Sequence, residues 1–136
     1  MNKQTRNIIN VSLTLVAIYL YSFTASNIET EILGFNSFKF LITIAVLIQF
    51  LIFLPSFIFK TEKFYDLTGS LTYISVTSIA YFSLDNPTTT DTILFLYVVI
   101  WAGRLGIFLF RRVNKVGKDV RFDKAKKKFF WFLQYW

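Results

Sequence analysis

The stretch from Ile93 to Phe110 limits the possible folds of this chain more than any other part of the sequence. Its residues, ILFLYVVIWAGRLGIFLF, carry a single charge, on Arg104. Because an α-helix rises about 1.5 Å per residue, this stretch would span roughly 27 Å, close to the thickness of a bilayer's hydrocarbon core. Most of the chain's 15 basic residues follow it, in a loop over 111–128. We therefore expect a transmembrane helix that ends in a cytoplasmic basic loop, as the positive-inside rule predicts.

The composition agrees with a membrane protein and excludes several kinds of chemistry. Hydrophobic residues make up 54% of the chain and aromatic residues 20%, which is more apolar than an ordinary soluble domain. The chain has no Cys and no His, so a disulfide framework, a thiolate nucleophile and the usual zinc sites are excluded, and we expect no metal site. Its net charge of +7 comes mainly from bases beside apolar segments. Membrane topology accounts for that charge, and we expect no nucleic-acid partner.

Three further apolar segments precede this one, and the charges of their loops alternate. Basic residues precede the first segment and follow the second and the fourth, whereas the two other loops are acidic. This pattern predicts that the N-terminus lies in the cytoplasm. We expect an all-α polytopic membrane helix bundle, built as a single membrane domain over residues 1–136. The expected transmembrane spans are 8–23, 38–59, 67–84 and 93–110.

The last residues of the sequence, FFWFLQYW over 129–136, are strongly apolar but too short to cross a membrane. They would serve either as an aromatic anchor at the membrane interface or as the start of a fifth span. We favour the second interpretation. It implies that this chain is the N-terminal piece of a longer protein.

Polar residues inside two of the expected spans predict contacts between helices. Gln49 is the strongly polar residue in the middle of span 38–59, and we expect it to hydrogen-bond to a neighbouring helix. Span 67–84 is rich in Ser, Thr, Gly and Tyr rather than Leu and Phe. A helix of that composition is expected to face protein or a cavity rather than lipid.

The fourth span carries a stripe of residues that a helix would place on one face. These residues are spaced by three or four positions: Tyr97, Trp101, Arg104, Phe108, Arg111 and Lys115. An arginine within the membrane is costly enough to need a partner, water or a ligand, which makes Arg104 a candidate functional residue. The alternative is that its side chain extends to the inner interface.

Asp66 and the basic loop each allow a functional and a structural interpretation. Asp66 directly precedes span 67–84 and could cap that helix, or it could supply a carboxylate beside a ligand cavity, paired with Arg104. The bases after the fourth span could contact anionic lipid headgroups. They could instead form forked contacts to a phosphate group. The residues alone leave these alternatives open.

Four segments, FYDLTGSLTYI, WAGRLGIFLFRR, GKDVRFD and FFWFLQ, resemble the N-terminal half of bacterial membrane proteins in the steroid 5-alpha-reductase-like family. The likeness is greatest to the branch catalogued as a domain of unknown function, and it covers about Lys63 to Trp136. It implies a larger helix bundle in the bacterial inner membrane that binds NADPH from the cytoplasmic side. Such an enzyme transfers a hydride to the carbon–carbon double bond of a hydrophobic, lipid-like enone, while a carboxylate and a tyrosine polarise the carbonyl oxygen.

This resemblance assigns roles to particular residues. Asp66 stands where the family has its acid, Arg104 fits the arginine of an aromatic-x-x-Arg pattern, and Tyr65 is the tyrosine beside that acid. Trp101 stands where steroid reductases carry the catalytic tyrosine, and an indole cannot exchange a proton as a phenol does. The proton donor is therefore open among Tyr65, Tyr73 and Tyr97. The residues expected towards NADPH are Arg111, Arg112, Asn114, Asp119 and Arg121, and those expected to contact substrate are Trp101, Tyr97 and Tyr73.

The resemblance also predicts what this chain lacks. The family's Arg-His-Pro-Asn-Tyr-like segment, which carries most cofactor contacts, is absent, and the chain has no histidine. We therefore expect an N-terminal part of a membrane oxidoreductase that is inactive alone. Two alternatives are a membrane methyltransferase that uses S-adenosylmethionine and a non-catalytic scaffold that binds anionic lipids. The sequence leaves the substrate and the oligomeric state open.

Overall fold

The computed structural model describes residues 3–24, 31–117 and 122–136. These ranges are almost entirely helical, as the sequence predicted. A short antiparallel hairpin, in which Glu31 pairs with Asn36 and Ile32 with Phe35, is the exception. The elements in chain order are α1 (Lys3–Thr24), β1 (Glu31–Ile32), β2 (Phe35–Asn36), α2 (Ser37–Ile58), α3 (Tyr65–Phe82), α4 (Thr89–Val116), a 3-10 turn (Ala125–Lys127) and α5 (Phe129–Tyr135).

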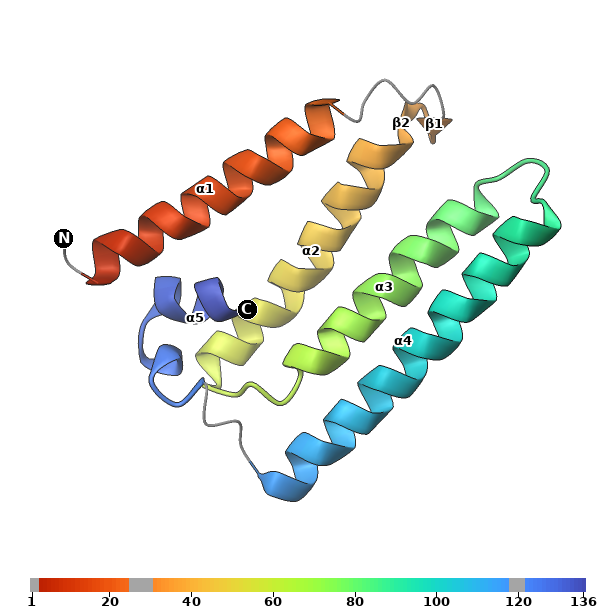
Figure 1. Ribbon diagram of the computed structural model, residues 1–136. Helices are drawn as coiled ribbons and strands as arrows, with labels where there is room; N and C mark the ends of the chain where they lie inside the picture. Colours follow the sequence, from red (N-terminus) through yellow and green to blue (C-terminus); the bar gives the residue numbers. More distant parts are fainter. Residues whose placement is uncertain (1–2, 25–30, 118–121) are drawn as a thin grey trace.

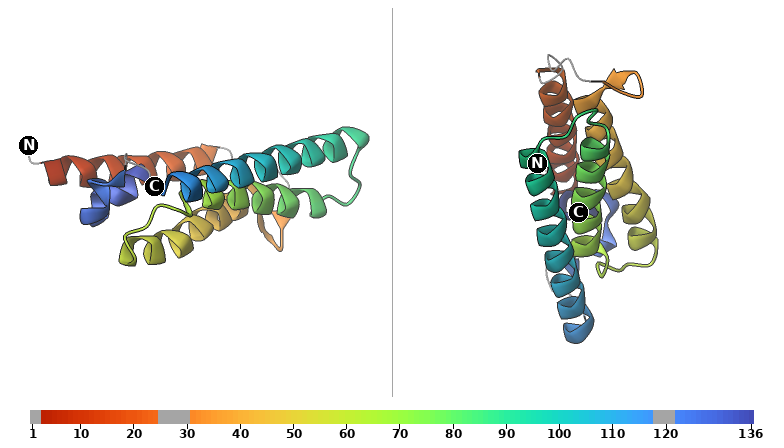
Figure 2. Two further views of the ribbon diagram at one scale, coloured as in Figure 1. Left: turned by 90° about the horizontal axis from the view of Figure 1, so that it is seen from below. Right: turned by 90° about the vertical axis from the view of Figure 1, so that its right-hand side faces the viewer.

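The four long helices lie side by side in the order of the sequence (Figure 1). α3 packs most extensively against α4 and next against α2, whereas α1 packs mainly against α5. The short α5 therefore lies between α1 and the C-terminal part of α2, as Figure 1 and the left view of Figure 2 show. The bundle has a tight half, made by α2, α3 and α4, and a looser half along α1.

Three helices in the described part of the chain are long and apolar enough to cross a membrane. They are Thr5–Thr24 within α1, Ser37–Ile58 and Thr89–Val116, and they contain the expected spans 8–23, 38–59 (to within a residue) and 93–110. α3 occupies the position of the fourth expected span, 67–84, but it is not among these three helices, because its Ser, Thr, Gly and Tyr residues lower its mean hydropathy. The chain is thus a helical membrane protein, whose exposed apolar side chains are compatible with a bilayer.

The aromatic residues near the end of the chain form α5, which folds back onto α2. Phe53 of α2, Phe122, Ala125 and Phe132 are fully buried together and form the core of this region. Phe132 is completely inaccessible to solvent, so one face of the predicted fifth apolar segment is covered by protein in this structure.

Local signals explain where the helices begin and end. The Asn36 side chain accepts a hydrogen bond from the Lys39 backbone N–H and caps α2. Thr88 and Asp91 form a reciprocal capping box at the start of α4. Gly117 ends α4 in the left-handed conformation, with a φ of 87°, which glycine adopts without the steric cost of a Cβ.

The close contact between α3 and α4 depends on Gly106. A Cβ atom at this position would lie 2.4 Å from Ser70 Oγ, and Ser70 is buried. We expect Gly106→Ala to destabilise the bundle by about 1–3 kcal/mol, because the two helices must separate to admit the methyl group. Gly103→Ala is the matched control, since nothing lies within 4 Å of its added Cβ. Unfolding titrations in detergent, followed by circular dichroism, would measure the stability of both variants. If Gly106→Ala and Gly103→Ala were equally stable, the close packing of α3 on Gly106 would be contradicted.

Candidate functional site

α3 presents candidate residues to two neighbouring helices. Gly69, Thr72 and Tyr73 line a groove that α2 also borders. Asp66 pairs with Arg112 of α4. Tyr73 follows Asp66 by seven residues, which places it on nearly the same face of the helix, and it also contacts Trp101 of α4.

The groove beside α3 has a volume of about 490 Å³. A smaller cavity of about 210 Å³ adjoins it and shares four of its lining residues, Leu15, Phe50, Leu133 and Trp136. The groove is bounded by α1, α2, α3 and α5. Its lining residues are Leu15, Ile18, Ala45, Val46, Gln49, Phe50, Phe53, Gly69, Thr72, Tyr73, Leu133 and Trp136.

Few polar groups interrupt this apolar lining. Gln49 Nε2 donates a hydrogen bond to Thr72 Oγ1 at 3.0 Å, which confirms the predicted bond from Gln49 to another helix. Thr72 Oγ1 in turn donates to the Thr68 carbonyl at 2.8 Å. The indole Nε1–H of Trp136 is buried and has no acceptor among the described residues. A largely apolar groove with a few fixed polar groups is typical of a small-molecule site.

The candidate tyrosines differ in their relation to this groove. Tyr73 lines it, and its ring packs edge-on against Trp101 with ring centroids 5.5 Å apart. Tyr65 is half-buried and packs against Trp136, which lines the groove, with ring centroids 5.5 Å apart. Tyr97 is 71% exposed on α4 and does not line the groove. Tyr73 and Tyr65 are therefore the better candidates for contact with a ligand.

Asp66 occupies a different position from the one expected. It lies in the first turn of α3, after the N-cap residue Phe64, so the prediction that it caps the helix is wrong. Its carboxylate lies 4.0 Å from Arg112 Nη2, so the expected pairing with Arg104 is also wrong. The reason is the position of each arginine along α4. Arg112 follows Arg104 by eight residues, so it lies roughly 12 Å nearer to the start of α3, where Asp66 is found.

The predicted stripe on α4 does share one face, which is exposed along its length, although Trp101 at one edge packs against Tyr73 of α3. Ala102, Gly106 and Val113 are the buried residues of α4. The stripe residues are all exposed: Tyr97, Trp101, Arg104, Phe108, Arg111 and Lys115. The structure therefore does not bring Arg104 to Asp66 or to the groove.

Three of the five residues expected near a cofactor lie in the last turns of α4. Arg111, Arg112 and Asn114 are exposed there, and the Arg112 side chain is 49% exposed despite its contact with Asp66. Asp119 and Arg121 lie outside the described residues. Two neighbouring guanidinium groups with free donors can bind phosphate oxygens.

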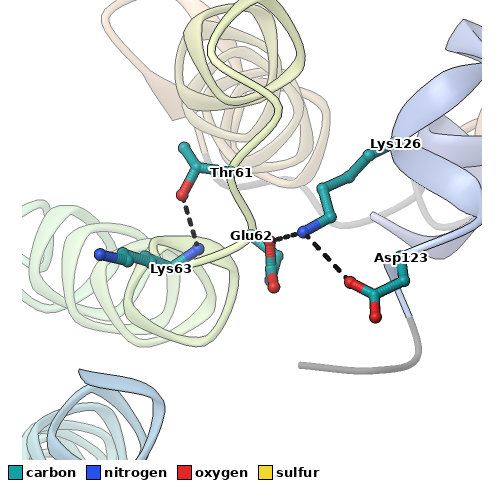
Figure 3. Close-up of polar contacts among 5 residues, drawn as sticks. All are labelled: Thr61, Glu62, Lys63, Asp123 and Lys126. Atoms are coloured by element: carbon teal, nitrogen blue, oxygen red, sulfur yellow. Dashed lines mark hydrogen bonds and ion pairs between the residues drawn. The ribbon is translucent and has the colours of Figure 1, made fainter. Parts of the chain in front are cut away.

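A buried ionic cluster that was not predicted from the sequence lies at the same end of the molecule (Figure 3). The Glu62 carboxylate, in the loop between α2 and α3, accepts a hydrogen bond from Lys126 Nζ. Lys126 also lies 3.7 Å from Asp123. The side chains of Glu62 and Lys126 are only 4% and 15% exposed. Lys126 is one of many bases in its loop, so no local pattern marked it as the buried one.

Comparison with known proteins identifies a family for most of the chain. A family model described as "Protein of unknown function (DUF1295)" matches residues 50–135. The match covers the end of α2, all of α3 and α4, and α5, which include the Asp66–Arg112 pair and much of the groove. No curated protein matches the chain, and no solved structure matches it.

Proposed function

The chain belongs to the DUF1295 family of proteins of unknown function, and we propose that it is the N-terminal part of a membrane oxidoreductase. The proposed reaction is the NADPH-dependent reduction of a carbon–carbon double bond in a steroid-like or other lipid enone. The resemblance of its α3 and α4 segments to the steroid 5-alpha-reductase-like family supports this reaction. The proposed location is the bacterial inner membrane.

The groove between α1, α2, α3 and α5 is the observation that carries this proposal. Its volume of about 490 Å³ lies within the range of small-molecule sites. Its lining is mostly aliphatic and aromatic, with the Gln49–Thr72 pair and the Tyr73 phenol as polar exceptions. A hydrophobic substrate with one or two oxygen atoms would satisfy this combination.

We include α3 as a fourth transmembrane span. Its 18 residues would extend about 27 Å, enough to cross the hydrocarbon core. It lies between α2 and α4, so its Ser and Thr side chains face protein more than lipid. Four crossings bring the N-terminus, the α2–α3 loop and the basic end of α4 to one side of the membrane. The positive-inside rule supports a cytoplasmic location for that side.

The cytoplasmic end of α4 would hold the cofactor. The exposed Arg111 and Arg112 side chains fit the phosphate groups of NADPH, and Asn114 lies on the next turn. We propose Asp119 and Arg121 as further contacts from the loop. When bound, the cofactor supplies the hydride. Asp66 would then hold Arg112 in position.

Tyr73 is the tyrosine that we propose to contact the substrate carbonyl. It lines the groove, and a phenol can donate a hydrogen bond to a carbonyl oxygen as negative charge develops there. Tyr65, which packs against the groove residue Trp136, is the second choice. Trp101 would hold the Tyr73 ring by its edge-on contact.

Replacement of the Tyr73 hydroxyl should test this assignment. In the native protein in its membrane, Tyr73→Phe is expected to lower kcat about 10²- to 10⁴-fold, the usual contribution of a positioned proton donor. Tyr97→Phe is the matched control and should retain nearly full activity, because Tyr97 is exposed away from the groove. NADPH consumption with a 3-keto-4-ene steroid or a long-chain acyclic enone would be followed. Equal rates for the two variants would reject the role of Tyr73.

The exposed bases at the end of α4 also fit a scaffold that binds anionic lipids. If the protein is such a scaffold, replacing Arg111 and Arg112 with glutamine should weaken its binding to phosphatidylserine vesicles. The same replacement should have no effect on cofactor binding, because a scaffold binds no cofactor. A methyltransferase would bind S-adenosylmethionine in place of NADPH. Binding of each cofactor to the native protein separates the three functions.

A further inference from the structure

Arg104 is a charged side chain in the apolar part of α4 that has no partner within the described ranges. It is the only charged residue between Ile93 and Phe110. Its side chain is exposed on the outer face of α4. The ion pairs of the described residues instead join Arg112 to Asp66 and Lys126 to Glu62 and Asp123. Since Arg104 would face lipid there, its charge requires compensation.

The direction of α4 makes it difficult for the Arg104 guanidinium group to reach the nearer membrane surface. Arg104 precedes Phe110 by six residues, so its Cα lies roughly 9 Å inside the apolar stretch. Each Cα–Cβ bond of a helix tilts towards the N-terminus. The Arg104 side chain therefore leaves α4 in the direction of the membrane centre, away from the basic end at Arg111. To reach the surface it must bend back along its own helix.

Gly103, next to Arg104 in sequence, leaves room for another helix at the edge of this outer face. An added Cβ at Gly103 would meet nothing within 4 Å, whereas one at Gly106 would collide with Ser70. Gly106 thus serves the packing of α3 on α4, and Gly103 has no such use in the described structure. Small residues on a lipid-facing surface allow the backbones of two transmembrane helices to approach closely. Phe108, 62% exposed, lies on the same side of the helix as Arg104.

We propose that this outer face of α4, formed by Arg104 and Phe108 with Gly103 at its edge, binds a transmembrane helix of another protein that carries an Asp or Glu side chain at the depth of Arg104. Charge complementarity identifies this partner, because a carboxylate is the side chain that best compensates an arginine in lipid. A second copy of this chain does not fit. Its acidic residues all lie outside the long apolar stretches: Glu29, Glu31, Glu62, Asp66, Asp85, Asp91, Asp119 and Asp123.

Model transmembrane peptides provide the test. The protein, in vesicles of phosphatidylcholine, is mixed with a labelled Leu-Ala peptide that carries one Glu at the matching depth, or Gln at the same position. Energy transfer from a donor on the protein measures association. We expect the Glu peptide to bind at least about fivefold more tightly than the Gln peptide, as a polar contact between membrane helices allows. The preference should disappear in Arg104→Gln and persist in Arg104→Lys.

Two controls make the outcome decisive. Arg111→Gln, at the end of the helix, should leave the preference for the Glu peptide unchanged. Gly103→Leu should weaken binding of both peptides, because the bulky side chain blocks the approach of a helix. Equal binding of Glu and Gln peptides to the unchanged protein would overturn the proposal, and so would a preference that survives Arg104→Gln. Either result would mean that Arg104 is compensated by lipid phosphate or water. This test is independent of the proposed reductase activity.

Discussion

Replacing Phe53 by alanine is expected to lower the free energy of unfolding by about 3–5 kcal/mol, the usual cost of removing a buried aromatic ring. Phe53 is completely buried. Its ring packs against Phe129, Phe132 and Trp136, with centroid distances of 5.2, 5.5 and 5.8 Å. The substitution would therefore empty the centre of the cluster that attaches α5 to α2. Because Phe53 also lines the groove, ligand binding there should weaken as well.

Phe59→Ala is the matched control for this substitution. Phe59 caps the end of the same helix and is 77% exposed, so its loss should cost less than about 1 kcal/mol. Unfolding titrations with a denaturing detergent, followed by near-ultraviolet circular dichroism, would compare the variants. If Phe53→Ala were no more destabilising than Phe59→Ala, the aromatic cluster would not be what holds α5 in place.

Replacing Glu62 by glutamine is expected to destabilise the protein by about 3–5 kcal/mol, because it leaves the buried ammonium group of Lys126 without its main counter-charge. Lys126 is 15% exposed and would retain only the contact with Asp123 at 3.7 Å. The cluster joins the α2–α3 loop to the segment before α5 (Figure 3). When the cluster is lost, the segment before α5 should therefore detach from the α2–α3 loop before the rest of the protein unfolds.

Two further variants test whether the unpaired charge of Lys126 is the cause of the lost stability. Glu62→Leu combined with Lys126→Met should recover most of the lost stability, since an apolar pair avoids an unpaired buried charge. Asp123→Asn should cost less than about 1 kcal/mol, because that side chain is 35% exposed. Hydrogen exchange of residues 122–136 would report the release. Similar losses for Glu62→Gln and Asp123→Asn would show that burial of the pair does not matter.

Much of the helical architecture could be predicted from the sequence because hydropathy acts over whole segments. The apolar runs gave three helices able to span a membrane. Gln49 was also predicted correctly, because a lone amide in a membrane helix must find a partner. The segment that forms α3 was also predicted as a helix, and its polar composition reflects its place between two helices.

The pairing of charged residues could not be predicted because it depends on the relative depth of the helices. The sequence offered Arg104 as one possible partner of Asp66, but the offset between α3 and α4 brings Arg112 to it instead. Lys126 and Glu62 are 64 residues apart, and neither differs in local pattern from its charged neighbours. The groove also involves α5, whose return to α1 and α2 no periodicity encodes.

Photolabelling of the native protein with a long-chain enone that carries a diazirine tests the central claim most directly. If a lipid-like substrate occupies the groove, label should appear on the lining segments around Gln49–Phe53 and Thr72–Tyr73, and excess unlabelled enone should remove it. Label spread evenly over the lipid-facing residues of α1, α2 and α4, without competition, would contradict a substrate site in this groove.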